Sequence, residues 1–434
     1  MRLTTARRAA VFGSAALLLL GPTVAIAQAD PAPAPAPLPV ELSDAIARDL
    51  KLTADEYLQR ADLAQQLAGF AATARTQFPA AFAGSWLNEA GQAVVALADA
   101  PDLEAARTAA ESAGFVVKPV AKSESSLNAE KQSFDAWLAT QPVQIASLVR
   151  AVAIDIVNNA LAVRIDATAG GLTLPGFLDA VRVVLMPPVQ GAEPVVPAAD
   201  PIAGELAPNA LQGGDPYASI STESSLRCSL GFNGSDSAGN VVNVSAGHCD
   251  PNLAAAGTPD ASAVHELRAL DVLGPQIGTF QKTSLDNHDY SIIRIANDAK
   301  SRFDNNAVRV PGRAPLTITG IAEPVVGAPV CKAGARTGFS CGVVNAVAQS
   351  VAVGDRNLND SFSANICALP GDSGGAVVTG TLALGISSAS TVAEYPFCEI
   401  PNLIGPFIGN EPQLFSTPVS VVLAENPGLT IRTS

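Results

Sequence analysis

A serine, a histidine and an aspartate in the C-terminal half could together carry out nucleophilic chemistry. Ser373 lies in the segment Pro370-Gly-Asp-Ser-Gly-Gly-Ala376, a glycine-flanked turn between two apolar segments. Small neighbours let a substrate carbonyl approach the serine Oγ, and the backbone N–H groups of Gly371 and Ser373 can point at one spot, as an oxyanion site requires. Because Gly-Asp-Ser-Gly is also ordinary loop composition, the motif alone does not decide the function.

A serine needs a neighbouring base to take its proton, and the chain has three histidines. His248 ends the strand-like run Val241 to Cys249, where the adjacent cysteine could pin a turn. His265 lies in a polar segment, which favours an exposed surface residue. His288 adjoins Asp289 and cannot easily point the same way on a strand, which favours a structural or exposed residue. We therefore expect His248 to be the base, the alternative being a buried structural histidine.

The base in turn needs a shielded carboxylate that fixes its tautomer and orientation. Asp289 begins a strongly apolar strand that runs to Ile295, and a carboxylate there is costly to bury without partners. Of the other acidic residues in this half, only Asp372 is predicted to be buried. The sequence thus predicts a catalytic set of His248, Asp289 and Ser373, in that order along the chain.

The N-terminal segment predicts export from the cell. Arg2, Arg7 and Arg8 precede an apolar run and the small-residue site Ala25-Ile-Ala27, which is typical of a secretory signal peptide cleaved after residue 27. An uncleaved membrane anchor is the alternative, although the apolar run is shorter than a spanning helix needs. Residues 28–41 contain an Ala-Pro alternation within Asp30–Pro39 and predict an extended linker.

Residues 42–187 predict a cysteine-free α+β region of two small units. The predicted elements are a helix opened by a capping box at Thr53–Glu56, a hairpin over Phe82–Ala98, a helix over Asp102–Gly114 and a strand over Phe115–Val120, then a helix near Leu127–Thr140, a hairpin turning at Asn158-Asn159, a short helix and a strand at Val183–Leu185. Residues 188–212 read as an exposed linker, where proteases cut. Residues 213–434 carry short alternating strands and predict an all-β barrel or sandwich domain.

Composition narrows the class of protein further. Of 434 residues, 48% are hydrophobic, which excludes a disordered chain. The net charge of −14, without a Lys/Arg cluster past the first eight residues, argues against binding to nucleic acid or to an anionic membrane. All six cysteines lie between Cys228 and Cys398, and export predicts that they pair, although their connectivity stays open at this point.

Six short segments that contain five of the cysteines, His248, Asp289 and Ser373 follow one another along the C-terminal half. They are Arg-Cys228-Ser-Leu-Gly-Phe232, Ser-Ala-Gly-His248-Cys249, His-Asp289-Tyr-Ser-Ile-Ile, Cys331-Lys-Ala-Gly, Thr-Gly-Phe-Ser-Cys341-Gly and Cys367-Ala-Leu-Pro-Gly-Asp-Ser373-Gly-Gly. With this order and spacing the chain resembles the secreted bacterial serine endopeptidases of the chymotrypsin superfamily, the streptogrisin and α-lytic protease group. The likeness spans about residues 211–390, and the preceding region, with Phe82-Ala-Gly-Ser-Trp-Leu87, is similar in layout to that family's propeptide.

The resemblance implies a fold and a role for each site residue. It implies two six-stranded antiparallel β-barrels after an α+β propeptide, with His248 as general base, Asp289 as its orienting carboxylate and Ser373 as the nucleophile. The N–H groups of Gly371 and Ser373 would form the oxyanion hole, and Ser388, Ala389 and Ser390 would pair with substrate. The implied disulfides are Cys228–Cys249, Cys331–Cys341 and Cys367–Cys398.

The resemblance also implies the protein's partners and life cycle. Protein or peptide substrates are expected, without a metal or organic cofactor, and the mature enzyme is expected to be a secreted monomer. Its own propeptide would help it fold and block its cleft until self-processing in the linker. An ester hydrolase with the same catalytic set, or a surface binding module that kept the barrel without activity, are the alternatives.

Departures from the family pattern raise further expectations. Lys332 stands where many relatives have an arginine and would face Asp372, and a lysine cannot offer the planar fork of an arginine. Ala389 and Ser390 replace glycines and should narrow the side-chain pocket or shift the approaching substrate strand. Asn365 and Ile366 put no carboxylate at its base, which favours a small or apolar residue before the scissile bond. The long apolar tail over residues 391–418 is expected to line the pocket or form an extra loop.

Overall fold

The computed structural model describes residues 38–166, 174–176, 181–187, 189, 206–269, 272–310, 312, 314–354, 356–408 and 411–434. All of these belong to one compact unit, Leu38–Ser434. The predicted signal peptide, nearly all of the Ala-Pro linker, most of the second linker and the predicted short helix before Val183 lie outside the described residues.

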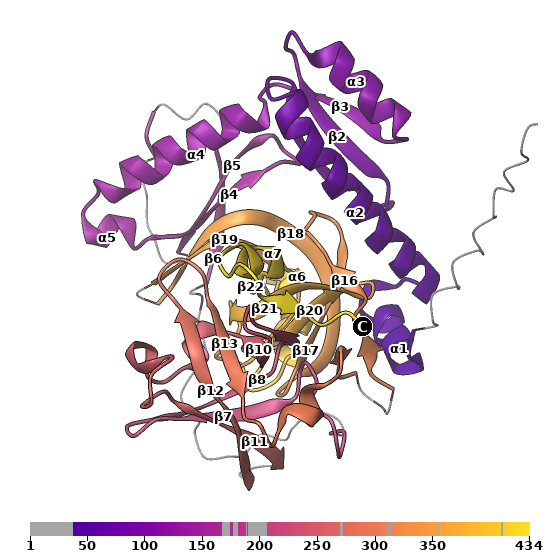
Figure 1. The fold of residues 1–434 in the computed structure, drawn as a ribbon. Helices are drawn as coiled ribbons and strands as arrows, with labels where there is room; N and C mark the ends of the chain where they lie inside the picture. Colours follow the sequence, from indigo (N-terminus) through magenta and orange to yellow (C-terminus); the bar gives the residue numbers. More distant parts are fainter. Residues whose placement is uncertain are drawn as a thin grey trace, which may run out of the picture. The chain divides into compact units, whose positions relative to one another are not determined.

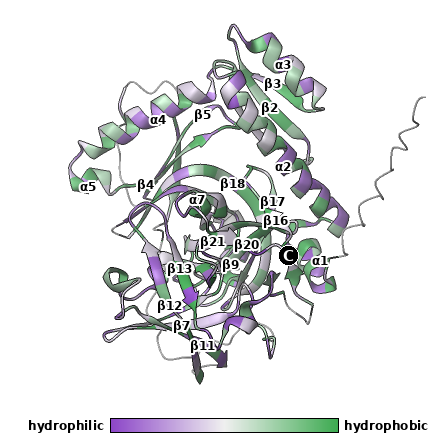
Figure 2. Cartoon of the chain, viewed as in Figure 1, coloured by the Kyte–Doolittle hydropathy of each residue, from purple (hydrophilic) through white to green (hydrophobic). Residues whose placement is uncertain are grey.

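The first unit of the N-terminal region packs helices against a small sheet. Its elements are α1 (Val40–Leu50), α2 (Ala54–Gln77), β1 (Phe82–Leu87), β2 (Ala93–Ala98), α3 (Leu103–Ser112) and β3 (Val116–Val120), with the sheet order β1-β2-β3. The predicted capping box opens α2, because the Thr53 hydroxyl accepts from Glu56 N–H while the Glu56 carboxylate accepts from Thr53 N–H. The central strand β2 is buried throughout and hydrophobic along its length (Figure 2).

The second unit repeats this plan with the predicted hairpin and helix. Its elements are α4 (Glu124–Ala139), α5 (Val143–Ala146), β4 (Val149–Asp155), β5 (Ala160–Asp166) and β6 (Val181–Met186). The hairpin turns at Asn159 with a φ of 54°, a left-handed conformation that asparagine tolerates well. Phe134 of α4 is fully buried against the apolar face of β4 and β5, so the helix and the hairpin share one small core.

Residues 216–295 form the first barrel of the C-terminal region. Its strands are β7 (Pro216–Ile220), β8 (Ser225–Ser229), β9 (Phe232–Ser235), β10 (Val241–Ser245), β11 (Ala263–Ala269), β12 (Val272–Ser284) and β13 (Tyr290–Ile295). They pair in the order β9-β10-β13-β12-β11-β7-β8, and only Leu230 and Gly231 separate β8 from β9, so these two halves of one strand close the ring. The short strand β23 (Thr430–Ile431) adds to β9 from the end of the chain.

The second barrel closes by strand pairing alone. Its strands are β17 (Pro329–Gly334), β18 (Gly338–Val353), β19 (Arg356–Ala364), β20 (Ala376–Thr379), β21 (Leu382–Ser390) and β22 (Leu414–Pro418), paired in the order β17-β20-β21-β22-β19-β18. The ring is completed where β17 pairs with β18, a long strand that curves strongly (Figure 1). The fold is therefore the trypsin-like all-β architecture expected from the sequence, preceded by an α+β region that fits a propeptide.

Short elements connect and cover the two barrels. They are the 3-10 segments η1 (Gly247–Cys249), η2 (Leu253–Ala255) and η3 (Lys300–Phe303), the strands β14 (Ala307–Val308), β15 (Leu316–Thr317) and β16 (Gly320–Ile321), and the helices α6 (Glu399–Ile408) and α7 (Val419–Ala424). Strand β16 extends the second barrel by pairing in parallel with β21, and β14 pairs with β15.

The N-terminal region is joined to the second barrel through a shared sheet. Ser350 and Val351 on β18 pair with Val152 and Ala151 on β4. The structured part of the C-terminal region also begins earlier than the predicted boundary at residue 213, because Leu211 lies in the core of the first barrel and its N–H donates to Arg302 O at 2.8 Å. Helix α1 likewise begins at Val40, within the segment predicted as linker.

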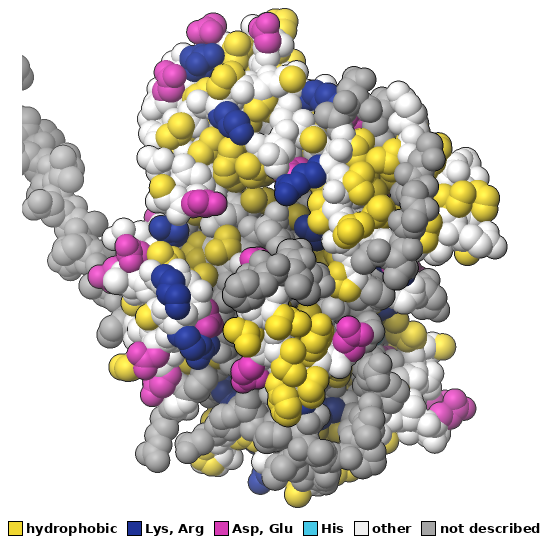
Figure 3. Space-filling model, turned by 180° about the vertical axis from the view of Figure 1, so that it is seen from behind, with side chains coloured by type: hydrophobic (Ala, Val, Ile, Leu, Met, Phe, Trp, Pro, Cys, Tyr) yellow, Lys and Arg dark blue, Asp and Glu magenta, His cyan; other side chains and the backbone are white. Residues whose placement is uncertain are grey.

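Three disulfides staple the C-terminal region, joining Cys228 to Cys249, Cys331 to Cys341 and Cys367 to Cys398. Within the described part of the chain, no helix is long and apolar enough to cross a membrane. On the face seen in Figure 3, Lys and Arg side chains are scattered among acidic and apolar ones rather than gathered into a patch.

Candidate active site

His248 lies in η1, immediately after β10 of the first barrel. The tight turn depends on Gly247, because a Cβ at that position would come within 2.0 Å of Ser284 O. The next residue, Cys249, is joined by its disulfide to Cys228 on β8. Strand pairing on one side of His248 and a disulfide on the other therefore fix the backbone position from which the imidazole projects.

Asp289 lies just before β13, the strand that pairs with β10, and its side chain is completely buried. Its Oδ2 lies 2.6 Å from His248 Nδ1, and its Oδ1 accepts from the backbone N–H of His248 at 2.9 Å. The carboxylate thus holds both the ring and the main chain of the histidine. A donor at Nδ1 leaves Nε2 as the basic nitrogen of the neutral ring.

Two further groups reach the same carboxylate from the second barrel. The Ser388 hydroxyl on β21 donates to Asp289 Oδ2, and Arg356 Nη1 on β19 lies 3.2 Å from that oxygen. Burial by itself raises the pKa of Asp289, but the charges of His248 and Arg356, together with these hydrogen bonds, outweigh it and hold the pKa well below its usual range. Ser388 was expected to serve substrate pairing alone, and Arg356 was missed because no local motif marks it.

The turn around Ser373 is packed against β8 and against the residues just before His248. Ser373 O accepts from Ser229 N–H on β8 at 2.8 Å. A Cβ on Gly374, which has a φ of 83°, would come within 2.0 Å of Ser245 Oγ and 3.1 Å of Ala246 N, just before the histidine turn. The glycine therefore lets the serine turn approach the end of β10, which brings Ser373 and His248 to the same junction between the barrels.

Hydrogen-bonding capacity is left open at this junction. Among the described residues, His248 Nε2 is buried without a hydrogen-bond partner, and the N–H groups of Gly371 and Ser373 donate to no protein acceptor. Gly371 has a φ of 104°, and its carbonyl is held by the Ser229 hydroxyl at 2.7 Å, which aims its peptide groups. In the ranges that the structure describes, this junction therefore holds an unpartnered imidazole nitrogen, two unpartnered backbone donors and a serine that is 7% exposed.

Asp372, next to the serine, forms an ion pair with Lys332, as expected from the sequence. Lys332 Nζ lies 3.1 Å from Asp372 Oδ2, and both side chains are fully buried. The carboxylate also accepts from the N–H groups of Arg336, Thr337 and Leu369 and from the Thr337 hydroxyl. Burial by itself raises the pKa of Asp372. The charge of Lys332 and the hydrogen bonds from Thr337 outweigh burial, so the pKa of this carboxyl lies below its usual range.

A narrow pocket of about 10 Å³, little more than the space of one water-sized sphere, opens beside Ser373. Its lining consists of Ala368, Leu369, Pro370, Asp372, Ser373, Ser387, Ser388, Ala389, Ser390 and Ala393. Ala389 and Ser390 thus line the pocket, with Ala393 from the tail. The expectation that Asn365 and Ile366 form the base is wrong, because both line a different cavity, between α1 and α6.

The other two histidines have structural surroundings. His288 lies between Glu425 Oε1, 2.7 Å from its Nδ1, and Asp360 Oδ2, 3.1 Å from its Nε2, so it ties the first barrel to the segments after α7 and within β19. His265 on β11 is half-buried rather than exposed as expected, because the strand carries it beside Gly274 O, 3.2 Å from its Nδ1.

The expectation that Asp289 and Asp372 are the only buried carboxylates in this half is also wrong. Asp215, Asp250 and Glu266 are each less than a tenth exposed. Distant arginines compensate two of them: Arg309 Nε lies 2.9 Å from Asp215 Oδ1, and Arg302 Nη1 lies 2.6 Å from Glu266 Oε2. Burial raises the pKa of Asp215 to about 6 even with Arg309 beside it.

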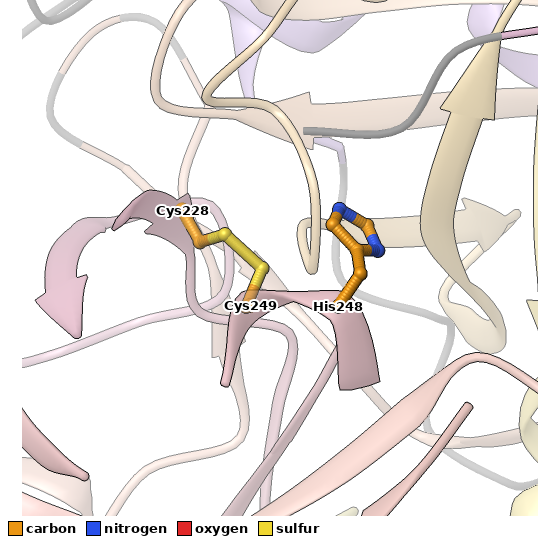
Figure 4. Close-up of side chains that lie close together, drawn as sticks. All are labelled: Cys228, His248 and Cys249. Carbon is orange, nitrogen blue, oxygen red and sulfur yellow. A yellow bond between two sulfur atoms is a disulfide. The ribbon is translucent and has the colours of Figure 1, made fainter. Parts of the chain in front are cut away.

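Cys228, His248 and Cys249 lie close enough together to suggest a metal site. Figure 4 shows that the two sulfur atoms are bonded to each other, while the imidazole points away from them. Metal ligation by cysteine needs thiolates, which a disulfide does not offer. This cluster is therefore a disulfide next to a site histidine.

Comparisons with known proteins find several proteins to which this chain is similar. A family model described as Trypsin matches residues 214–408. Streptogrisin-C of Streptomyces griseus is 30% identical over 403 residues, which span 90% of this chain and 79% of the relative. Serine protease 2 of Streptomyces fradiae is 34% identical over 170 residues, 38% of this chain and 87% of that protein. The crystal structure of Thermobifida fusca Protease A is similar at 26% identity and a TM-score of 0.40, covering 52% of this chain and 100% of that one.

The protein is thus a serine endopeptidase of the trypsin family. Within that family it belongs to the streptogrisin and α-lytic protease group, since its likeness to Streptogrisin-C covers nearly the whole of this chain, including the α+β region. The resemblance stated from the sequence is confirmed.

Proposed function

We propose that the enzyme cleaves peptide bonds with His248, Asp289 and Ser373 as its catalytic triad. The observation that carries the proposal is the 2.6 Å contact of His248 Nδ1 with buried Asp289, which leaves the opposite ring nitrogen, Nε2, shielded and unpartnered among the described residues. The packing of the serine turn against Ser245 and Ala246, just before His248, supports an approach of the nucleophile to that nitrogen.

The chemistry follows from these positions. His248 Nε2 takes the proton of Ser373 as its Oγ attacks the substrate carbonyl, and Asp289 stabilises the imidazolium that forms. The N–H groups of Gly371 and Ser373 hold the oxyanion of the tetrahedral intermediate. The imidazolium then protonates the leaving amine, the C–N bond breaks, and an acyl-enzyme ester remains on Ser373. Water, activated by the same imidazole, hydrolyses that ester and regenerates the serine.

An extended substrate can pair with Ser388, Ala389 and Ser390. Strand β20 pairs with β21 only as far as Ile386, while β22 pairs with the other edge at Ala389 and Ser390. The backbone edge past Ser387 is therefore open to a peptide strand, the usual way in which a sheet edge binds an extended chain. The narrow pocket beside it favours a small or apolar residue before the scissile bond, and the Asp372 carboxylate that lines it is already neutralised by Lys332.

The α+β region has the contacts expected of a propeptide that binds its own protease. Tyr57 of α2 is fully buried, and its hydroxyl accepts from Gly380 N–H, before β21, at 3.0 Å. Asp49 Oδ2 of α1 accepts from Cys341 N–H on β18 at 2.9 Å, and β4 pairs with the same strand nearer its far end. Three separate anchors on the second barrel support roles as a folding aid and an inhibitor.

The proposed life cycle divides the chain at the boundaries expected from the sequence. A signal peptide (1–27) and linker (predicted as 28–41, with α1 already beginning at Val40) lead into a propeptide (to 187). Self-cleavage within the second linker (predicted as 188–212), ahead of the core residue Leu211, releases a secreted, monomeric protease (predicted as 213–434) that acts on protein or peptide substrates. The mature half carries all three disulfides, which suits a protein that must persist outside the cell.

N-terminal sequencing of the secreted protein and of its Ser373→Ala variant tests self-processing. The wild-type protein should begin within or just after the second linker, whereas Ser373→Ala should retain the propeptide. Ser235→Ala, on β9 of the first barrel, is the matched control and should be processed normally. Equal processing of Ser373→Ala in a host without other extracellular proteases would overturn self-cleavage.

A further inference from the structure

Arg356 reaches the triad from an element that carries no other proposed catalytic residue. It is the first residue of β19, directly after the turn that joins β18 to β19. Its side chain is only 17% exposed, and its Nη1 lies 3.2 Å from Asp289 Oδ2. A positive charge is therefore held, largely out of water, against the carboxylate that orients the base.

This contact changes the net charge that Asp289 presents to His248. Oδ2 also receives the Nδ1 hydrogen of His248 and the Ser388 hydroxyl, so three donors converge on one oxygen. A carboxylate paired with a guanidinium has a smaller net charge to set against an imidazolium than a carboxylate with neutral donors alone. Arg356 thus anchors Asp289 and at the same time reduces the net negative charge beside the His248 ring.

The other charged groups described near Asp289 and His248 have hydrogen-bond or ion-pair partners of their own. His288, the neighbour of Asp289, lies between Glu425 and Asp360. Asp250, two residues after His248, accepts from the hydroxyls of Ser262 and Thr283. Under the serine turn, Asp372 is compensated by Lys332. Of the groups described, Arg356 is the cation in direct contact with the triad carboxylate.

We propose that Arg356 is a positioning residue of this protease, which clamps Asp289 from the β18–β19 hairpin and extends activity to lower pH by offsetting the negative charge that faces the His248 ring. The inference rests on the proposed triad. It also links the triad to the propeptide, since β18, which pairs with β19 at Arg356, also pairs with β4 through Ser350 and Val351.

The pH profile of kcat/KM separates this role from a merely structural one. Arg356→Gln removes the charge, so His248 should hold its proton to higher pH and the acid limb should move upward. The ratio of kcat/KM at about pH 5 to that at about pH 8 should fall roughly threefold or more, which corresponds to about half a pH unit. Arg356→Lys keeps a cation and should retain most of the wild-type ratio. Arg294→Gln, which removes an exposed arginine bonded to Asn240, should leave it unchanged.

A titration of His248 by NMR gives a readout that does not require activity. In the full chain with Ser373→Ala, adding Arg356→Gln should raise the pH midpoint of the His248 ring. The same midpoint with and without Arg356→Gln, or an unchanged kcat/KM ratio in the Gln variant, would overturn the inference. The proposed triad fails separately, if Ser373→Ala retains wild-type hydrolysis.

Discussion

Lys332 Nζ lies 3.1 Å from Asp372 Oδ2 in a place where neither side chain reaches solvent. The pair sits directly beneath the turn that presents Ser373, and the Thr337 hydroxyl contacts both partners. A buried charge without its partner is costly, so this turn depends on an ion pair formed between β17 and the serine motif.

Lys332→Met should therefore destabilise the enzyme and disturb the oxyanion turn together. Leaving Asp372 without its cation should cost about 3–5 kcal/mol in the free energy of unfolding, and kcat should fall. Lys332→Arg should fold, because it restores a cation that can pair in a fork. Urea unfolding and kcat measured on both variants check this, with Lys300→Met on η3 as the control. A Lys332→Met protein as stable as wild type would contradict the account.

The same pair predicts how stability changes with pH. The pKa of Asp372 is lower in the folded state than in the unfolded state, so the unfolded chain binds more protons in the window below about pH 4. Its contribution is therefore present above that pH and is lost as the pH falls through the folded pKa. Urea unfolding of the full chain with Ser373→Ala, at a series of pH values, should show this loss. The slope of the unfolding free energy against pH should become smaller when Lys332→Met and Asp372→Asn are added. An identical slope would count against the lowered pKa of Asp372.

Gly371→Ala tests the geometry of the proposed oxyanion hole. A φ of 104° is unfavourable for any residue with a Cβ, although the nearest atom to that Cβ, Arg336 Cβ, is 3.4 Å away, so the strain lies in the backbone. Turning this peptide should misplace its N–H and lower kcat by about 100-fold, with KM little affected. Gly239→Ala imposes a similar backbone cost at a φ of 76° in open space and should lose about 1 kcal/mol of stability without loss of kcat. Similar kcat values for the two variants would argue against an oxyanion role for Gly371.

Ser390→Gly tests what limits the side-chain pocket. Removing the Cβ and hydroxyl from the lining should admit a larger residue before the scissile bond. The kcat/KM ratio for a peptide with Phe at that position over one with Ala should rise by about tenfold, the worth of one or two buried methylene groups. Ser235→Gly, on the first barrel, serves as the control. A wild-type protein that already prefers Arg or Lys at that position would overturn the assignment of a small, apolar pocket.

Local patterns in the sequence were enough for the elements that depend on near neighbours. Thr53 and Glu56 mark the start of α2, and the turn at Asn158-Asn159 marks the β4–β5 hairpin, because capping and turn formation involve residues a few positions apart. The serine motif was recognisable for the same reason. The pairing of Lys332 with Asp372 could be expected only through the family resemblance.

Contacts between distant segments could not be predicted in this way. Arg356 meets Asp289 across 67 positions of the sequence because the start of β19 comes close to the residue just before β13 of the other barrel, and no spacing rule records that. Asp215 and Glu266 looked like loop residues, yet the barrel buries them beside Arg309 and Arg302. Asn365 was expected at the pocket base only because it lies two residues before Cys367 in the sequence. In the structure its side-chain Oδ1 accepts a hydrogen bond from Val343 N–H. The pairing of β4 with β18 likewise depends on tertiary structure.

Labelling of the secreted protein with an organophosphonate probe is the most direct test of the account. Such a probe reacts with a serine only when a base and an oxyanion site activate it. We expect mass spectrometry to find the adduct on Ser373, to find none in Ser373→Ala, and to find labelling strongly reduced in His248→Ala. An unlabelled wild-type protein that hydrolyses peptides, or an adduct on another serine, would contradict the proposed catalytic site.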